Sequence, residues 1–170
     1  TTGPCNGWLW TKCSFTQNGR HGLYARKTDI SIEVSYAHTF IACGSEYNGT
    51  DTDEMLIRAW YFSNFDQVTM IGCTGEGSAY LRSGVDCVEL EFAGTTARNF
   101  NIDGFQSILS TMAIKCGATL QSGTIKNIRW TPKDAETVAI QVNSANGTAA
   151  VSEPFIVINR DTVRGGTIDV

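Results

Sequence analysis

The feature that most constrains this chain is a 30-residue repeat marked by cysteine. Cys13, Cys43 and Cys73 stand 30 positions apart, and the residues around each of them are similar. Asn-Gly pairs follow the first two cysteines at the same offset, beginning at Asn18 and Asn48. A fixed period of roughly 20 to 50 residues is typical of a chain built by stacking copies of one structural unit. The repeat therefore predicts that residues one period apart become neighbours in space.

The repeated unit has the pattern of β-structure. Apolar residues alternate with other residues in short runs, as at 30–34, 90–92 and 138–142, and the spacing of amphipathic helices is missing. Turn-forming residues separate these runs. A period near 30 residues accommodates three short strands and three turns, so successive units are expected to stack as parallel sheets. We expect five to six such units, with the last ones near 126–130 and 155–159.

Later repeats keep the pattern with altered spacing. Phe105 follows Cys73 at a spacing of 32, and Trp130 follows Phe105 at a spacing of 25. If Phe105 takes the interior position of Cys73, strict alternation along the strand also turns Asp103 inward. A bulge or register shift is therefore expected at Asp103. A second series of apolar segments falls between the first, at 22–24, 55–57, 85–88, 112–114 and 138–140.

The six cysteines favour an interior column of free thiols. Metal sites built on cysteine use closely spaced pairs, and this sequence has none. Disulfides between stacked strands are the alternative, because neighbouring strands lie at about the separation that a disulfide bridges. A free cysteine packs as a small apolar residue and is commoner in reducing compartments, so we expect assembly in a reducing cytoplasm.

The charge and hydropathy of the sequence limit the classes of partner that are expected. The net charge is −4 and the Lys and Arg residues are scattered, so nucleic acid is not an expected partner. No apolar run approaches the length of a membrane span, so membrane insertion is not expected. The sequence begins at Thr1, without an initiator methionine, and we expect a single domain over 1–170 that is a fragment of a longer chain.

Two segments carry a resemblance to a known family. Residues 6–24 combine a strand, a core cysteine, Asn-Gly and a following Gly-Leu-Tyr, and residues 39–49 repeat the first half of this pattern. They resemble coils of the right-handed parallel β-helix in the pectate-lyase-like superfamily. Bacteriophage tail-spike and tail-fibre proteins are rich in such coils. The resemblance implies an all-β solenoid of five to six coils of 25–32 residues. It is specific for fold and weak for function, because this superfamily includes lyases, hydrolases, epimerases and non-catalytic rods.

For function, the resemblance implies a homotrimeric phage-like spike or fibre in a virion tail or extracellular setting. Such a protein would bind bacterial surface polysaccharide and, as a glycoside hydrolase or polysaccharide lyase, depolymerise it. The alternative is a non-catalytic receptor-binding or structural rod of the same fold. No nucleophile elbow, zinc-protease motif or phosphate loop occurs, so acyl transfer, zinc proteolysis and nucleotide chemistry are unsupported.

Glu46 and Glu76 are the candidate catalytic pair. Each follows its repeat cysteine by three residues, so the register places them on neighbouring strands about 4.8 Å apart. Two carboxylates this close would raise one pKa and leave one protonated and one ionised group, as acid–base cleavage of a glycosidic bond requires. In the alternative interpretation both side chains extend into water or are neutralised by a basic group.

Aromatic and basic residues are the candidate ligand contacts. Alternation sends Tyr61 to the face opposite Trp60, so one of them faces outward. If Thr11 points inward, Trp8 and Trp10 point outward, where a sugar or a partner chain would cover them. Arg20 and His21 follow the first Asn-Gly turn and are candidate sugar contacts, with an ordinary turn histidine as the alternative. The candidate binding residues are Trp8, Trp60, Tyr61, His21 and Arg20.

The segment 48–54 combines turn formers with three carboxylates, Asp51, Asp53 and Glu54. Such oxygen ligands suit calcium, but the spacing is not that of a dedicated calcium loop, and we favour an acidic surface turn. No cofactor is expected, with calcium here as the alternative. Asn48 and Asn146 each begin an Asn-Gly-Thr triplet, which matches the glycosylation acceptor pattern, and we interpret both as turns.

Overall fold

The computed structural model describes residues 7–26, 37–49, 56–76, 86–117, 120–133, 138–142, 155–158 and 166–169. Within these ranges every regular element is a β-strand, and no helix long enough to cross a membrane is found. All strand pairings between them are parallel. The predicted all-β class with parallel sheets is confirmed. The strands are β1 (Leu9–Thr11), β2 (Ser14–Thr16), β3 (Leu23–Arg26), β4 (His38–Ile41), β5 (Gly44–Glu46), β6 (Leu56–Asp66), β7 (Val68–Ile71), β8 (Thr74–Glu76), β9 (Asp86–Asp103), β10 (Gln106–Ser110), β11 (Met112–Cys116), β12 (Leu120–Lys126), β13 (Arg129–Pro132), β14 (Val138–Val142), β15 (Phe155–Ile158) and β16 (Thr167–Asp169).

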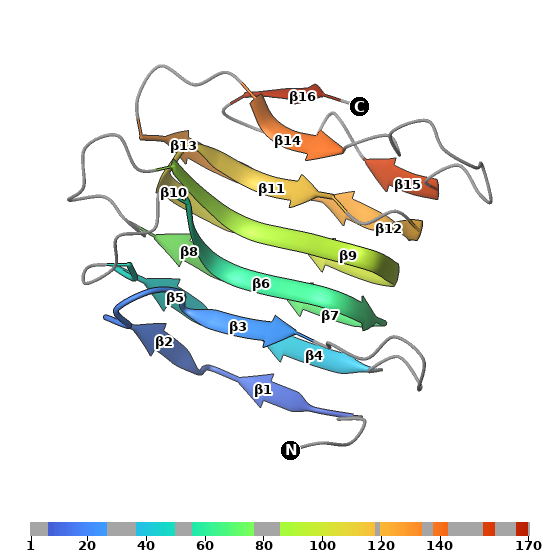
Figure 1. Cartoon of the computed structure of the whole chain (residues 1–170), viewed down its shortest axis with the longest axis horizontal. Helices are drawn as coiled ribbons and strands as arrows, with labels where there is room; N and C mark the ends of the chain where they lie inside the picture. The colour runs from blue at the N-terminus through green and yellow to red at the C-terminus, as the bar shows by residue number, and fades with distance from the viewer. Residues whose placement is uncertain are drawn as a thin grey trace.

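The strands form three ladders. From β1 to β15 the chain passes through ladder one, ladder two and ladder three in a fixed, repeating order. Ladder one contains β1, β4, β7, the end of β9, β12 and β15. Ladder two contains β2, β5, β8, β10 and β13, and ladder three contains β3, β6, the start of β9, β11, β14 and β16. Because β9 runs through ladders three and one, these two form one 11-stranded sheet, and ladder two is a separate 5-stranded sheet. The strands rise in layers from β1 to β16 (Figure 1).

The 30-residue register is confirmed for the first three layers. Thr39 pairs with Leu9 in the layer below and with Thr69 in the layer above. Glu46 of ladder two pairs with Glu76 at the same spacing. Side chains 30 positions apart therefore form columns along the outside and inside of the molecule.

The register changes in the upper layers. Gln106 pairs with Thr74, which is the predicted spacing of 32. Gln106 also pairs with Arg129, a spacing of 23, so the prediction that Trp130 lies 25 residues after its equivalent Phe105 is wrong by two. The connection between these layers is shorter than the sequence pattern suggested.

The second predicted series is correct in one part and wrong in another. Ile57 pairs with Cys87, as expected. Leu23 pairs with Trp60 instead of Leu56, so the first step of this series is wrong by four residues. The cause is connection length: seven residues lead from Thr16 to Leu23, whereas 14 lead from the equivalent Glu46 to Trp60.

One left-handed residue between ladders one and two decides which side chains face inward. Such a residue rotates the chain and interrupts the inward–outward alternation. Ile71 is therefore exposed although Cys73, two residues later, is buried. In the five layers that contain both ladders, these residues are Lys12 (φ 52°), Ala42 (φ 51°), Gly72 (φ 59°), Gly104 (φ 72°) and Asn127 (φ 56°).

The left-handed corner at Gly104 makes the expectation that Asp103 faces inward wrong. Strict alternation turned Asp103 inward, but the left-handed Gly104 lies between it and the buried Phe105. Asp103 instead lies outside, where its carboxylate accepts from Asn127 Nδ2 at 2.7 Å and pairs with Lys126 Nζ at 3.1 Å. These donors and the Lys126 charge lower the pKa of Asp103. The ladder is continuous through Asp103, so the expected bulge is wrong as well.

The equivalent corner at Lys12 makes the expected directions of Thr11 and Trp10 wrong. Thr11 is exposed, and Trp10 points inward to stack on Phe40 with ring centroids 6.4 Å apart and planes 8° apart. The left-handed Lys12 separates Thr11 from Cys13, so the two do not share a face. Trp8 remains exposed, as predicted, although one edge contacts the buried His38 ring at a centroid distance of 5.0 Å.

The interior is a column of aromatic and thiol side chains. Phe62, Phe92 and Phe100 stack in sequence, with centroid distances of 5.7 Å and 4.6 Å. The five cysteines in the described ranges are free thiols, as predicted. Cys73 Sγ donates to the backbone oxygen of Phe40 at 3.4 Å, and burial raises the pKa of Cys73 to about 11. These thiols act as small packing groups.

Substitution of Gly104 tests whether the corner between ladders one and two requires a left-handed residue. A β-branched side chain is strained at a positive φ, so Gly104→Val should lower the free energy of unfolding by about 2 kcal/mol. Gly104→Asn should cost much less, because Asn127 already occupies the equivalent corner one layer above. A Cβ at Gly104 would meet no atom closer than 3.5 Å, so the difference would report backbone conformation. Urea denaturation of both variants measures it, and equal losses would contradict the assignment.

Candidate functional site

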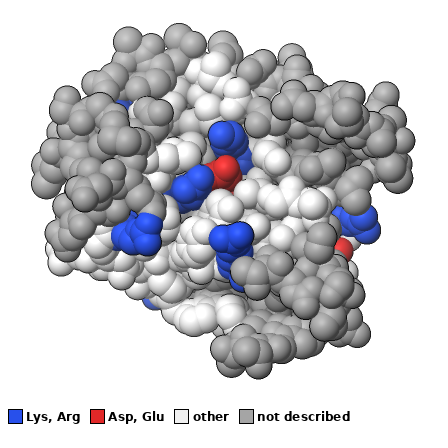
Figure 2. Space-filling view, in the orientation of Figure 1, with Lys and Arg blue, Asp and Glu red and all other residues white. Residues whose placement is uncertain are grey.

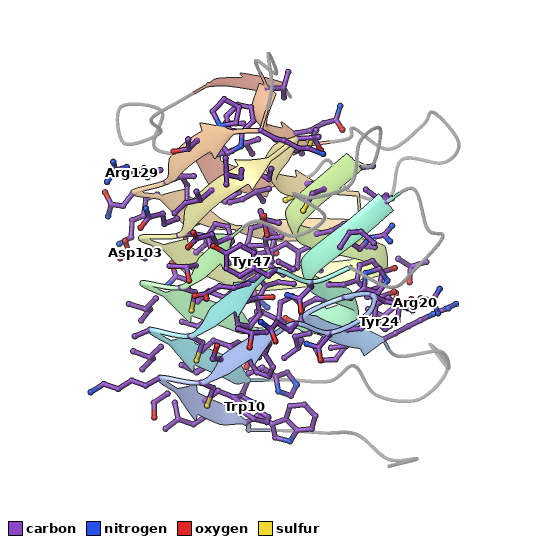
Figure 3. The ribbon with its side chains drawn as sticks, turned by 90° about the vertical axis from the view of Figure 1, so that its left-hand side faces the viewer. Trp10, Arg20, Tyr24, Tyr47, Asp103 and Arg129 are labelled. Carbon is purple, nitrogen blue, oxygen red and sulfur yellow. The ribbon has the colours of Figure 1, made fainter. Side chains whose placement is uncertain are left out.

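An open pocket of about 460 Å³ lies where the chain enters ladder three. The sequence singled out two of its lining residues, Arg20 and His21, and the structure brings them together. It adds Tyr24, which lies beside Arg20 at β3 (Figure 3). The described lining residues are Asn18, Arg20, His21, Gly22 and Tyr24.

A buried asparagine fixes the turn that carries this pocket. The Asn48 side chain is fully buried and donates to the backbone oxygen of Phe15 at 3.1 Å and to Ser45 Oγ at 3.0 Å. Its carbonyl oxygen accepts from the backbone N–H and the side-chain amide of Asn18, both at 3.0 Å. Because this amide is used inside the protein, the folded chain cannot be glycosylated at Asn48. Asn146 lies outside the described residues.

His21 is held as a neutral hydrogen-bond donor. Its Nδ1 accepts the backbone N–H of Arg58 at 3.2 Å, which places the proton of the neutral ring on Nε2. Burial, followed by the positive charges of Arg58 and Arg20, lowers the pKa of His21 to about 4. At neutral pH this imidazole is uncharged and is a poor general base.

A stack of planar groups continues from His21 along ladder three. The rings of His21 and Tyr24 lie 5.0 Å apart, and those of Tyr24 and Tyr61 lie 4.6 Å apart with planes 11° from parallel. The Arg58 guanidinium lies 4.9 Å from the centre of the Tyr61 ring and forms an ion pair with Glu91. Since the ring faces cover one another, Tyr24 and Tyr61 present edges and hydroxyl groups outward.

The predicted tryptophans lie away from this pocket. Trp60 is fully buried, and its indole N–H donates to the backbone oxygen of Thr74 at 2.9 Å. It faces the core because it occupies the inward position of ladder three, opposite Leu23 and Leu90. Trp8 precedes β1 of ladder one and does not line the pocket. Of the predicted aromatic contacts, Tyr61 alone belongs to the stack beside the pocket.

The predicted carboxylate pair lies on ladder two. Glu46 and Glu76 are direct register partners and are both partly exposed, as the 30-residue repeat predicted. The hydroxyl of the exposed Tyr47 lies 3.5 Å from Glu76 Oε1. Asp51, Asp53 and Glu54 lie outside the described residues. Within the described ranges no group of three or more metal-ligating side chains occurs.

Basic side chains gather on the outer face of ladder three. Figure 2, which views this face, shows Lys and Arg side chains around an acidic one. Tyr24, Tyr61, Glu91 and Lys115 follow one another in register, with Arg58 beside them. The outer face of ladder three therefore combines aromatic rings with charged groups of both signs.

Comparison of this chain with protein-family models, with curated proteins and with solved structures found no match. The site is therefore interpreted from its own residues.

The lowered pKa of His21 predicts a pH-dependent stability. Between about pH 6.5 and pH 4 the unfolded chain binds a proton at His21 that the folded chain does not, so stability is present above this window and falls as the pH falls through it. His21→Gln should reduce this loss. Urea denaturation at pH 7.5 and pH 4.5 measures the difference for both proteins. An identical pH dependence in the two would contradict the assignment.

Proposed function

We propose that this chain is a right-handed parallel β-helix of five to six coils from a phage-like tail spike or fibre, and that it binds bacterial surface polysaccharide. The support for the fold is the repeated order of ladders one, two and three, with strands joined in parallel at a period near 30 residues. Parallel strands joined by crossovers are right-handed in nearly all proteins. The resemblance of residues 6–24 and 39–49 to tail-spike coils supplies the class of ligand and the homotrimer.

The observation that carries the binding proposal is the pocket at the start of β3. It combines the guanidinium of Arg20, the neutral imidazole of His21 and the phenol of Tyr24 on one rigid turn. Planar polar groups of this kind bind sugar hydroxyl and ring oxygens through several directed hydrogen bonds. The Asn48 contacts and the ring stack hold the turn before ligand arrives, which lowers the entropic cost of binding.

Cleavage of the polysaccharide is the second part of the proposal, and Glu46 and Glu76 carry it. Their register places two carboxylates on adjacent strands, which suits acid–base catalysis by a glycoside hydrolase or a polysaccharide lyase. One observation favours a non-catalytic receptor-binding rod instead: the two carboxylates lie on ladder two, and the pocket opens at ladder three.

Binding is tested with Tyr24→Ala on an array of bacterial capsule and lipopolysaccharide glycans. We expect the parent chain to bind a subset of these glycans and Tyr24→Ala to bind them at least about 10-fold more weakly, a loss of about 1.4 kcal/mol. Leu9→Ala is the control, because Leu9 is also an exposed residue with a large apolar surface but lies on ladder one, outside the pocket and outside the Glu46–Glu76 pair. No bound glycan, or equal losses in the two variants, would refute the site.

Cleavage is tested with Glu46→Gln and Glu76→Gln on the glycan that binds. We expect the parent to release fragments, detected as new reducing ends or unsaturated ends, and each variant to lose about 100-fold or more in rate with binding retained. Unchanged rates in both variants would remove the pair from the mechanism. If the parent releases no fragments, the rod is the correct interpretation.

A further inference from the structure

We propose that Asn18 is a site of spontaneous deamidation, which converts its side chain into a carboxylate and weakens the attachment of the pocket turn to Asn48. Asn48 carries the same Asn-Gly motif one layer above and is protected from this reaction. The modification goes beyond the proposed polysaccharide binding and does not depend on it. Its support is the exposure of Asn18, the backbone N–H that follows it, and the hydrogen bonds that the product loses.

The reaction requires an asparagine followed by an unhindered backbone nitrogen. This nitrogen attacks the side-chain amide carbon, loses its proton and expels ammonia, which leaves a succinimide ring. Water then opens the ring and gives aspartate or isoaspartate, so water is the only other reactant. A following glycine favours the attack because it has no side chain to restrict the backbone. The chain has four Asn-Gly pairs, at Asn6, Asn18, Asn48 and Asn146, and the first and last of these asparagines lie outside the described residues.

Asn18 lies in an environment that permits the attack. Its side chain is exposed, and Gly19 after it is half-buried. In the part of the chain that the structure describes, no backbone hydrogen bond uses the Gly19 N–H. The Asn18 amide nitrogen donates to Asn48 Oδ1 at 3.0 Å and to the Gly22 oxygen at 3.4 Å, whereas its carbonyl oxygen accepts from no described donor. An exposed amide carbon and an unused backbone nitrogen are therefore adjacent in the chain.

Asn48 carries the same motif in a closed environment. Its side chain is fully buried, and both ends of its amide are hydrogen-bonded within the protein. Gly49 donates its backbone N–H to the Asn18 oxygen at 2.8 Å, so the nitrogen that would attack is occupied. A Cβ at Gly49 would lie 2.6 Å from Ile57 Cγ1, which shows how tightly this backbone is packed. The fold therefore separates two copies of one motif into a reactive and a protected site.

Deamidation would remove a donor that joins the pocket turn to Asn48. The Asn18 amide nitrogen becomes a carboxylate oxygen, which is an acceptor only and faces the Asn48 carbonyl oxygen across the former 3.0 Å bond. Turning the Asn48 amide around would place its carbonyl oxygen against the backbone oxygen of Phe15, to which its nitrogen now donates at 3.1 Å. Both arrangements bring two acceptors together at a buried side chain, which is costly. The turn is therefore loosened, and the pocket that Asn18 lines gains a negative charge.

The direct test is peptide mapping of the folded chain after prolonged incubation at neutral pH. Trypsin places the four Asn-Gly pairs on different peptides, so their mass changes are read separately. We expect Asn18 to deamidate at least about 10-fold faster than Asn48, whose reaction requires local opening of the fold. Enzymatic methylation of isoaspartyl carboxylates identifies the second product. No conversion of Asn18, or equal rates at Asn18 and Asn48, would overturn the inference.

Two controls separate the fold from the local sequence. In concentrated urea the hydrogen bonds of Asn48 are lost, so we expect Asn18 and Asn48 to react at similar rates. A difference that persists in urea would belong to the sequence and would overturn the protection by the fold. In the folded chain, Gly19→Ala should slow the reaction at Asn18 at least about 10-fold, because a side chain restricts the attacking backbone. An unchanged rate would contradict attack by the backbone nitrogen of residue 19.

The structural effect is tested with two variants of Asn18. Asn18→Asp reproduces the aspartate product, and Asn18→Ala removes the same amide donor without adding a charge. We expect the midpoint of urea denaturation to fall in both variants and to fall further in Asn18→Asp, because only this variant sets a second acceptor against Asn48. A midpoint for Asn18→Asp equal to or above that of Asn18→Ala would overturn the loosening of the turn.

Discussion

The structure depends on backbone hydrogen bonds between strands in successive layers. Strands of three or four residues, such as β1 and β2, cannot persist alone. Each is held by parallel pairing with the strand about 30 residues later, as when Gly44 donates its backbone N–H to Cys13 at 2.9 Å and Thr74 donates to Cys43 at 2.9 Å. This register converts sequence period into spatial contact, so that interior thiols and aromatic rings, as well as exterior charges, form columns.

The corner residues and the register together decide what reaches the surface. A left-handed residue at each corner lets the last residue of a ladder-one strand face outward while the residue after the corner, such as Cys43, Cys73 or Phe105, is buried. On ladder three the register places stacked rings and charged groups in one outer column, in which Arg58 contacts both Tyr61 and Glu91. The pocket forms where this column meets the turn held by Asn48. The residues proposed to bind ligand thus lie together at the entry to ladder three.

Sequence reasoning found what the repeat itself encodes. Cys13, Cys43 and Cys73 gave the register, and from it the pairing of Glu46 with Glu76. It failed where a single torsion or a loop length intervenes. Lys12 and Ala42 adopt positive φ although neither residue type signals such a turn, so Trp10 was assigned to the wrong face. Tyr24 was missed because its partner Tyr61 is 37 residues away, outside the period, and the longer connection into β6 has no signature.

The register itself is tested most directly by disulfide trapping. Thr39 and Thr69 are paired on the outer face of ladder one, whereas Ile71 is offset by two residues along the neighbouring strand. Paired residues on adjacent strands lie about 5 Å apart and the offset pair about 8 Å apart, and only the first distance suits a disulfide. The account predicts rapid oxidation of Thr39→Cys/Thr69→Cys and little of Thr39→Cys/Ile71→Cys. Equal or reversed yields would contradict the stacking of residues 30 positions apart.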